Sequence, residues 1–307
     1  ADYESTNYTF GLKYYPVPSL LVRASRSTTF LPATPSQLTE NPFVNQTGGI
    51  ITYDPVLDIT YSPSLRVPQV SGGNASLKPQ NSVSTLAGFV WQPSWRALKG
   101  LRLNADYYRI EQSDAIGFLT DQEMVYEEAT YPARVTRDPV TNVITAINVR
   151  NVNIYGRNSE GVDAGLEYAF DAGGGRFNLG VMYSRIMKLE TQYAYDKPVY
   201  DGAGFPGETD GSVKDKATAS LLWERGPLTL SWSTQYFGAY KQIGAAGGPQ
   251  SVRNANGAEY VNVYLTTQGR PTIPSQMFHD LYVGYAFARG AAAGVTWLGG
   301  ARLDGLT

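Results

Sequence analysis

The stretch GVDAGLEYAFDAGGGRFNLGVMYS, residues 161–184, decides the fold. Before its glycines, every second residue is apolar or aromatic and the residues between are small or polar; the first set is Val162, Ala164, Leu166, Tyr168 and Phe170. The same alternation resumes from Phe177 to Tyr183. A period of two residues is that of a β-strand. The glycine-rich DAGGGR between the two runs therefore predicts a hairpin turn and not a phosphate-binding loop.

The same unit of strand, turn and strand recurs along the chain. We predict five turn-linked pairs: 5–15 with 20–28, 81–92 with 101–111, 159–170 with 176–190, 213–224 with 228–238, and 277–288 with about 300–307. Residues 143–150 add a short strand inside a long loop. Most predicted strands match the roughly 9–11 residues of a tilted membrane-crossing strand, whereas strands of soluble proteins usually have about 5–6 residues.

The connections between these strands alternate in length. Short turns are predicted at 16–19, 93–100, 171–175, 225–227 and about 288–294, and long irregular segments at about 29–80, 112–158, 191–212 and 239–274. Outer-membrane barrels join their strands by short periplasmic turns and long extracellular loops in strict alternation. A soluble β-sandwich has no reason to sort its loops in this way. The pattern predicts an all-β, antiparallel, up-and-down transmembrane β-barrel.

Aromatic residues mark the predicted membrane boundaries, where amphipathic rings gather. One aromatic residue closes each strand that enters a short turn, and we assign this set to the periplasmic aromatic girdle: Tyr14, Trp91, Phe170, Trp223 and Phe287. The far ends of the rising strands carry the outer girdle: Tyr107, Tyr183 and Tyr236. We predict that lipid is contacted by Leu228, Leu230, Trp232, Leu281, Val283 and Tyr285. The opposite face carries predicted solvated groups of the barrel wall: Lys13, Arg102, Asp106, Asp163 and Glu167.

Composition argues against several functions. The 307 residues carry a formal net charge of −2 and no cysteine. Nucleic acid is therefore not an expected partner, and disulfides and thiolate metal sites are excluded. The single histidine, His279, precedes Asp280, but adjacent residues of a strand point to opposite faces and do not form a catalytic pair. No catalytic residue and no cofactor are predicted, and the protein is not expected to be an enzyme.

Two acidic pairs, Asp54 with Asp58 and Glu127 with Glu128, fall in predicted external loops. Loop carboxylates can bind Ca²⁺, but the spacing of a calcium-binding loop is missing. We therefore expect solvated loop residues and predict no metal site.

Two segments of the chain resemble sequence patterns of a known family. GGNASLKPQ (72–80) resembles the segment G-N-x-x-L-x-P-E that leads into a barrel strand, with Gln80 in place of the usual Glu. LVRASRSTTFLPATPSQL (21–38) is similar to R-x-S-x-x-x-F-R-A-P-x-x-x-E-L, from which Leu31 and Gln37 depart. Both patterns are those of TonB-dependent receptors.

Two later segments extend this resemblance over most of the chain. NVNIYGRNSEGVDAGLEYAF (151–170) resembles the opening of another strand of the family, with Asp163 where Glu is usual, and HDLYVGYAF (279–287) resembles a late strand. The four segments occur in the family's order. The resemblance implies a barrel of 22 strands, of which residues 1–307, as one partial domain, supply about ten. A plug with its TonB box and the final strand would lie outside this domain.

The resemblance also implies a function. In the family, ligand binds on the extracellular side between long loops and plug, and TonB supplies the energy for import. We therefore expect active import of a scarce nutrient, such as a siderophore, cobalamin or a carbohydrate, across the bacterial outer membrane. The implied partners are membrane lipid, the plug and, through it, TonB. Candidate ligand contacts are the loop aromatics Tyr53, Tyr126 and Tyr195, and the sequence leaves the ligand's identity open.

Two alternatives stay open at this point. A passive porin or another outer-membrane pore would have the same strands without an upstream plug. A soluble β-sandwich binding module would bury its alternating apolar residues between two sheets, Leu228, Leu230, Leu281 and Val283 among them.

Overall fold

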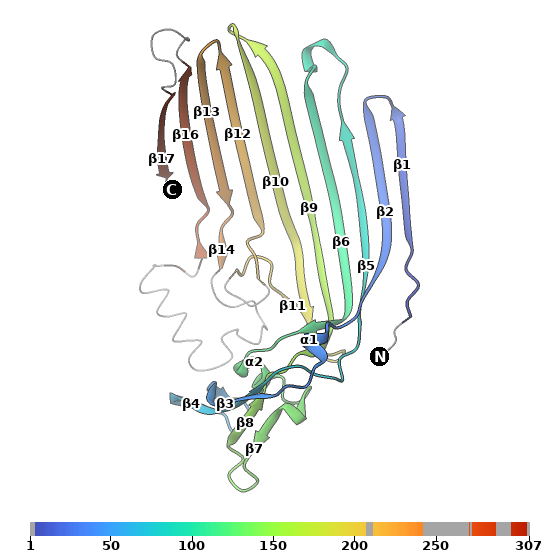
Figure 1. Ribbon diagram of the computed structural model, residues 1–307, viewed down its shortest axis with the longest axis vertical. Helices are drawn as coiled ribbons and strands as arrows, with labels where there is room; N and C mark the ends of the chain where they lie inside the picture. The colour runs from blue at the N-terminus through green and yellow to red at the C-terminus, as the bar shows by residue number, and fades with distance from the viewer. Residues whose placement is uncertain (1–3, 207–210, 242–269, 271, 287–295, 306–307) are drawn as a thin grey trace.

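The computed structural model describes residues 4–206, 211–241, 270 and 272–286, and the backbone of 296–305. Its main element is a sheet of long strands lying side by side (Figure 1). A second, smaller group of elements lies at one end of these strands, opposite the short turns (Figure 1). The chain therefore has two structural regions, the main sheet and a group of ordered loops.

The main sheet contains all ten strands that the alternation predicts. In spatial order they are β1 (Thr9–Val17), β2 (Leu20–Leu31), β5 (Gln80–Trp91), β6 (Leu101–Gly117), β9 (Val152–Ala172), β10 (Gly175–Gln192), β12 (Asp215–Arg225), β13 (Leu228–Phe237), β16 (Gln276–Ala286) and β17 (Thr296–Gly305). Each pairs antiparallel with its neighbours. The short β11 (Tyr200–Asp201) pairs with β10. This order is that of an up-and-down sheet, as predicted.

Strand bounds differ from the prediction at several ends. β1 starts at Thr9 and not at residue 5, and β17 starts at Thr296 and not near 300. β9 has 21 residues because its first half continues to pair with the end of β6, up to Gly117 opposite Val152. Alternation is weak in this extension, so the sequence placed it in a loop.

The short turns between strands are built as predicted. Gly173 and Gly174 join β9 to β10 with φ of +58° and +75°, a conformation that favours glycine. Gly226 turns the chain between β12 and β13 with φ of +54°. A 3₁₀ turn, η1 (Arg96–Leu98), lies between β5 and β6. The turn predicted near 288–294 lies outside the described residues.

Strand register sorts the side chains of the main sheet into two faces, because directly paired residues share a face. One row joins Phe170, Phe177, Trp223, Leu230 and Val283 through successive pairings. We call this the apolar face. A row on the other side joins Lys13, Arg23, Gly88, Asp106 and Asp163. We call this the polar face.

The predicted long loops are not irregular, which corrects the expectation for 29–80 and 112–158. They form a second sheet in the order β3 (Phe43–Asp54), β4 (Ile59–Ser71), β8 (Ile144–Asn148) and β7 (Val135–Arg137). The short helices are α1 (Pro35–Leu38), α2 (Asp121–Tyr126) and η2 (Pro132–Arg134). β8 confirms the extra strand predicted at 143–150. We call residues 43–71 and 118–151 the loop module. A further short ladder pairs β14 (Tyr240–Lys241) with β15 (Thr272–Ile273).

The buried apolar core of the described residues lies in the loop module and in the adjoining ends of β6 and β9. Its members are Ile51, Val67, Ala115, Leu119, Met124, Val125, Val135, Ile144, Ile147, Val149, Val152 and Ile154. Apolar side chains of the main sheet are placed differently: Leu281 is 45% exposed, and Val283 and Tyr285 are exposed as well. Within the described residues no second sheet covers the apolar face, so the main sheet is not half of a sandwich.

Candidate functional site

The candidate site is the end of the main sheet that carries the loop module, since long loops hold the binding residues of a barrel of this kind. Figure 1 shows α2, β3, β4, β7 and β8 gathered beyond the ends of the strands that are farthest from the short turns. The three predicted ligand contacts, Tyr53, Tyr126 and Tyr195, belong to the long segments that connect the strands at this end.

An ion-pair cluster holds the module together. Arg137 donates from Nη1 and Nη2 to Asp54 at 2.7 and 2.9 Å, and from Nε and Nη2 to Glu128 at 2.8 and 2.6 Å. The Asp54 side chain is 0% exposed. Burial alone would raise the pKa of Asp54, but the hydrogen bonds from Arg137 and from the backbone N–H groups of Val56 and Leu57 outweigh it and lower the pKa. Its carboxylate therefore stays charged.

This cluster corrects the expectation that the acidic pairs are solvated. Asp54 is fully buried and Glu127 is 3% exposed, where it accepts a hydrogen bond from Thr130 Oγ1 at 3.0 Å. Asp58 is exposed, as predicted. Two of the four carboxylates neutralise Arg137, and no group of three or more metal-binding side chains occurs among the described residues.

Helix α2 covers part of the free edge of β3. Its N-terminal Thr120 accepts from Glu123 N at 3.3 Å, and Glu123 Oε2 accepts from Thr120 N at 2.7 Å, which forms a capping box. Gln122 Oε1 accepts from Thr52 N and Tyr53 N, at 2.9 and 3.1 Å, and Gln122 Nε2 donates to Tyr53 O at 2.8 Å. These contacts satisfy strand groups that would otherwise be open for pairing.

The three predicted tyrosine contacts lie at two separate places. Tyr53 and Tyr126 lie with ring centroids 6.4 Å apart, and Tyr53 donates to Asp58 Oδ1 at 2.7 Å, which raises the pKa of Tyr53. Tyr195 is 80% exposed and meets Tyr155 edge-on at 5.6 Å. The sequence analysis did not propose Tyr155, although it is an aromatic residue of the predicted long segment 112–158, which is the signal that selected Tyr126.

Short polar contacts attach the module to the barrel strands. Asn153, near the start of β9, accepts from Lys78 N at 2.8 Å and donates to Lys78 O and Asp114 O at 2.9 and 2.8 Å. Asn74 donates to Asn151 O at 2.9 Å. Tyr131 donates to Asn153 O at 3.2 Å, and its burial raises its pKa to about 12. The segment GGNASLKPQ (72–80) is thus hydrogen-bonded to residues 151–153 at the start of β9.

The polar face of the main sheet contains an ion pair that the sequence analysis missed. Arg23 binds Asp106 through Nε and Nη2, at 3.0 and 2.6 Å, and the Asp106 side chain is only 16% exposed. Gly88 lies between them in the register, and a side chain there would collide with Asp106. The prediction of a solvated Asp106 is therefore corrected. Arg102 and Glu167 are 43% and 68% exposed, as expected of solvated groups, and they lie 3.5 Å apart in an ion pair that the sequence analysis did not predict.

The predicted girdle residues lie near the short turns. Phe170 stacks on Tyr168 and Phe177, with centroids 4.7 and 5.1 Å apart, and Trp223 lies 6.1 Å from Phe177. Trp91 meets Trp95 edge-on, and Tyr14 is exposed. Phe287 lies outside the described residues. The register places all six predicted lipid-contacting residues on the apolar face: Leu228, Leu230, Trp232, Leu281, Val283 and Tyr285.

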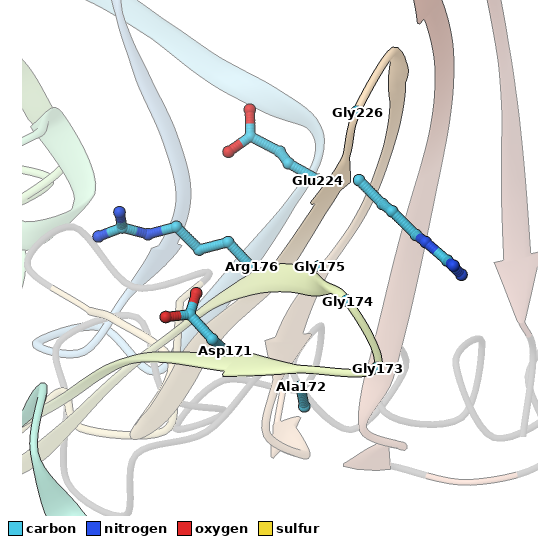
Figure 2. Close-up of a pocket in the computed structure, with 9 residues that line it drawn as sticks. Asp171, Ala172, Gly173, Gly174, Gly175, Arg176, Glu224 and Gly226 are labelled. Atoms are coloured by element: carbon cyan, nitrogen blue, oxygen red, sulfur yellow. The ribbon is translucent and has the colours of Figure 1, made fainter.

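Figure 2 shows the shallow hollow between two neighbouring short turns. Asp171, Arg176 and Glu224 point to one side there and Ala172 to the other (Figure 2). The first three are paired in one row of the polar face. This arrangement is a solvated rim of hairpins, not a phosphate site.

His279 and Asp280 lie on opposite faces, as predicted: His279 pairs in register with Thr234 and Asp280 with Ser233. The His279 ring stacks on Trp232, with centroids 5.7 Å apart. This geometry gives the pair no shared catalytic site.

Comparison with known proteins agrees with this architecture. A family model described as "TonB dependent receptor-like, beta-barrel" matches residues 1–302. The siderophore receptor PirA from Acinetobacter baumannii is similar with a TM-score of 0.54 at 13% identity, over 92% of this chain and 35% of that chain. A variant of the ferric enterobactin receptor PfeA from Pseudomonas aeruginosa is similar with a TM-score of 0.56 at 12% identity, over 92% of this chain and 33% of that chain.

At such identities the similarity concerns the fold alone. The chain spans about a third of the length of these receptors. None of the curated proteins compared with the chain matches it. Among the described helices, none is long and apolar enough to cross a bilayer.

Proposed function

The chain belongs to the TonB-dependent receptor family, within its β-barrel domain, and from that premise we propose that it forms wall and ligand-facing loops of an active importer in the bacterial outer membrane. The imported ligand is a scarce small-molecule nutrient. The partners are outer-membrane lipid, a plug domain that occupies the barrel and, through the plug, TonB.

One observation carries this proposal. The main sheet has apolar side chains on one face and polar side chains on the other, and its long loops lie at one end of the strands. The apolar face, with Leu281 and Val283 exposed, suits hydrocarbon, and the polar face, with Arg23, Asp106 and Asp163, suits a wet interior against a plug. Long ordered loops gather at one end only. A barrel wall with a receptor surface on one side of the membrane needs this arrangement.

Within this proposal the ligand meets exposed aromatic rings of the loops. Tyr195 is the best placed of the three candidates, because its ring is the most exposed and is held against Tyr155. Tyr53 and Tyr126 offer a second aromatic surface. By name, one structural neighbour is a siderophore receptor and another is a ferric enterobactin receptor, which makes ferric complexes the first ligands to test.

The test is uptake by cells that carry or lack the full-length protein containing this chain, in the presence and absence of TonB. We expect growth on limiting ferric siderophore, cobalamin or oligosaccharide to require both the protein and TonB for at least one nutrient. Uptake that needs the protein but not TonB would identify a passive pore instead. Loss of the protein without effect on any nutrient in either background would contradict import.

A further inference from the structure

A row of charged residues crosses the apolar face of the main sheet near the loop module. Strand pairing joins its members in the order Arg26, Thr85, Arg109, Glu160 and Lys188. Glu160 precedes Phe170 by ten residues on β9, an even number, so the row lies on the same face as Phe170. We call Arg26, Arg109 and Lys188, which belong to β2, β6 and β10, the cation row.

The cation row lies just beyond the outer aromatic girdle that the sequence predicts. Tyr107, a member of that girdle, is on the same face of β6 and two residues nearer to the short turns than Arg109. Aromatic rings of a barrel gather where hydrocarbon meets the headgroups of the lipids. The cation row is therefore at the level of the headgroups, where a long cationic side chain reaches polar groups while its stem covers apolar surface.

Arg26 has no anion within the protein. It is exposed, and among the described residues its guanidinium forms no hydrogen bond or ion pair. Its neighbours in the register are Phe10 on β1, which is 69% exposed, and Thr85 on β5. Charged groups on a lipid-facing surface are costly unless they are paired or reach the headgroups. The position of Arg26 thus calls for an anion from outside the sheet.

The other two members of the cation row are paired only in part. Arg109 donates from Nη2 to Glu111 Oε1 at 2.6 Å and is 44% exposed. Lys188 lies 3.9 Å from both Glu160 and Glu190, which is long for a charge-assisted hydrogen bond. Its side chain is 47% exposed, whereas those two carboxylates are 13% and 26% exposed. The ammonium group of Lys188 therefore faces outward, and its carboxylates lie against the sheet.

Cations at this end of the apolar face occupy one sector of the main sheet. Arg185, also on β10, adds a fourth cation, which is 53% exposed and 3.2 Å from Asp215. Farther along the sheet, the last residues of this face are Asp215 on β12, Tyr236 on β13 and Met277 on β16, none of them a cation. A local patch over β2–β10, and not an even belt, indicates a particular binding partner.

We propose that the cation row binds the phosphate of an anionic lipid headgroup, in the leaflet on the side of the loop module. Guanidinium and ammonium groups form strong charge-assisted bonds to phosphate oxygens, and basic groups at a membrane surface attract anionic lipids. This proposal rests on the membrane location proposed above. It adds the headgroup charge of the lipid partner and the sector that binds it.

The test places one fluorophore at Thr85→Cys, inside the row, in the full-length protein with any other cysteine replaced by serine. The protein is reconstituted in phosphatidylcholine vesicles that contain a small fraction of brominated lipid, either phosphatidylglycerol or phosphatidylcholine. We expect brominated phosphatidylglycerol to quench the label at least about threefold more strongly, because each cation near the surface favours anionic lipid. The triple variant Arg26→Gln/Arg109→Gln/Lys188→Gln should remove this preference.

Arg225→Gln is the matched control. Arg225 is an exposed cation of the same face, paired in register with Leu228 at the short-turn end, and its loss should change the preference less than twofold. The single variant Arg26→Gln guards against misfolding, since Arg26 has no contact among the described residues to lose; it too should weaken the preference.

Equal quenching by the two brominated lipids in the unmodified protein, or an undiminished preference in the triple variant, would overturn the headgroup site. TonB-dependent uptake by a protein that shows no lipid preference would refute this site and keep the import function. A preference that the triple variant removes, in a protein without any TonB-dependent uptake, would support the site and refute import.

Discussion

The main sheet and the loop module come from one chain but place apolar side chains in opposite ways. In the module, Ile51 and Met124 are 0% exposed inside a compact core. In the main sheet, Leu281 is 45% exposed on a face that nothing in the described residues covers. Water drives apolar groups inward, whereas a bilayer accepts them on the outside. The difference indicates that the loop module is surrounded by water and that the apolar face of the main sheet contacts lipid.

Charged groups repeat this contrast. Arg137 is 11% exposed and its partner Asp54 0%, so their mutual attraction is little screened by water. On the polar face of the sheet, Arg102 and Glu167 are 43% and 68% exposed and 3.5 Å apart, a pair of small energetic value. The buried pair therefore contributes more to the stability of the module than the exposed pair contributes to that of the sheet.

The largest expected effect comes from Arg137→Gln, which leaves Asp54 buried without a cation. We expect the unfolding free energy of the module to fall by about 3–5 kcal/mol, with little change in the central strands β9 and β10. Amide hydrogen exchange, compared between β3–β4 and β9–β10, measures both. The exposed Arg66→Gln is the control, with an expected change within about 0.5 kcal/mol. Equal losses in the two regions would show that they are not separate units.

A charge on the apolar face should have the next largest effect. Leu281→Arg should destabilise the barrel by about 2–4 kcal/mol in lipid vesicles, as a cation near the bilayer centre does. Tyr282→Arg, one residue along on the polar face, should cost much less. Denaturant unfolding of the two variants in vesicles makes the comparison. A larger loss for Tyr282→Arg would reverse the assignment of the faces.

A smaller effect is expected from Thr120→Ala at the start of α2. Removal of the Thr120 hydroxyl breaks the bond to Glu123 N and should cost about 0.5–2 kcal/mol. The loss should be confined to the module, where α2 covers β3, and it should appear as faster exchange of the Thr52 and Tyr53 amides. Unchanged exchange there would mean that the cap does not support this edge.

The smallest effect concerns pH. The pKa of Asp54 is lowered by folding from its ordinary value of 3.8. Its contribution is therefore fully present above that value and is lost as the pH falls through the lower, folded pKa. Module stability should be flat from neutrality to roughly pH 5 and should decline only in stronger acid. Arg137→Gln should reverse the sign, because a buried Asp54 without its cation gains from protonation; exchange rates at several pH values decide this.

Local sequence predicted the main sheet because its signal is local. Alternation over Val162–Phe170 and Leu228–Tyr236 sets both strand and face, and glycines such as Gly173 mark the turns. The strand ends at Gly117 and Val152 were missed, since they are held by pairing with each other.

The loop module could not be predicted in the same way. The register of β3 with β4 shifts between Asn45 and Gly49, which interrupts the alternation. β4 and β8 pair in parallel through Gln69 and Ile147, far apart in sequence. The same is true of the site: Asp54 and Arg137 are 83 residues apart, so the acidic pairs appeared solvated. The candidate tyrosines were found only as loop aromatics, without their partners.

The most direct test measures whether each region contacts lipid or water. These 307 residues contain no cysteine, so Leu281→Cys, Tyr282→Cys and Val140→Cys each add one labelling site to them. The fluorophore is attached in the full-length protein, with any cysteine outside these residues replaced by serine, and the protein is reconstituted in vesicles. We expect a quencher dissolved in the lipid tails to quench the label at 281 strongly and the labels at 282 and 140 weakly, with a water-soluble quencher reaching the label at 140. A label at 281 that only the aqueous quencher reaches would contradict the account.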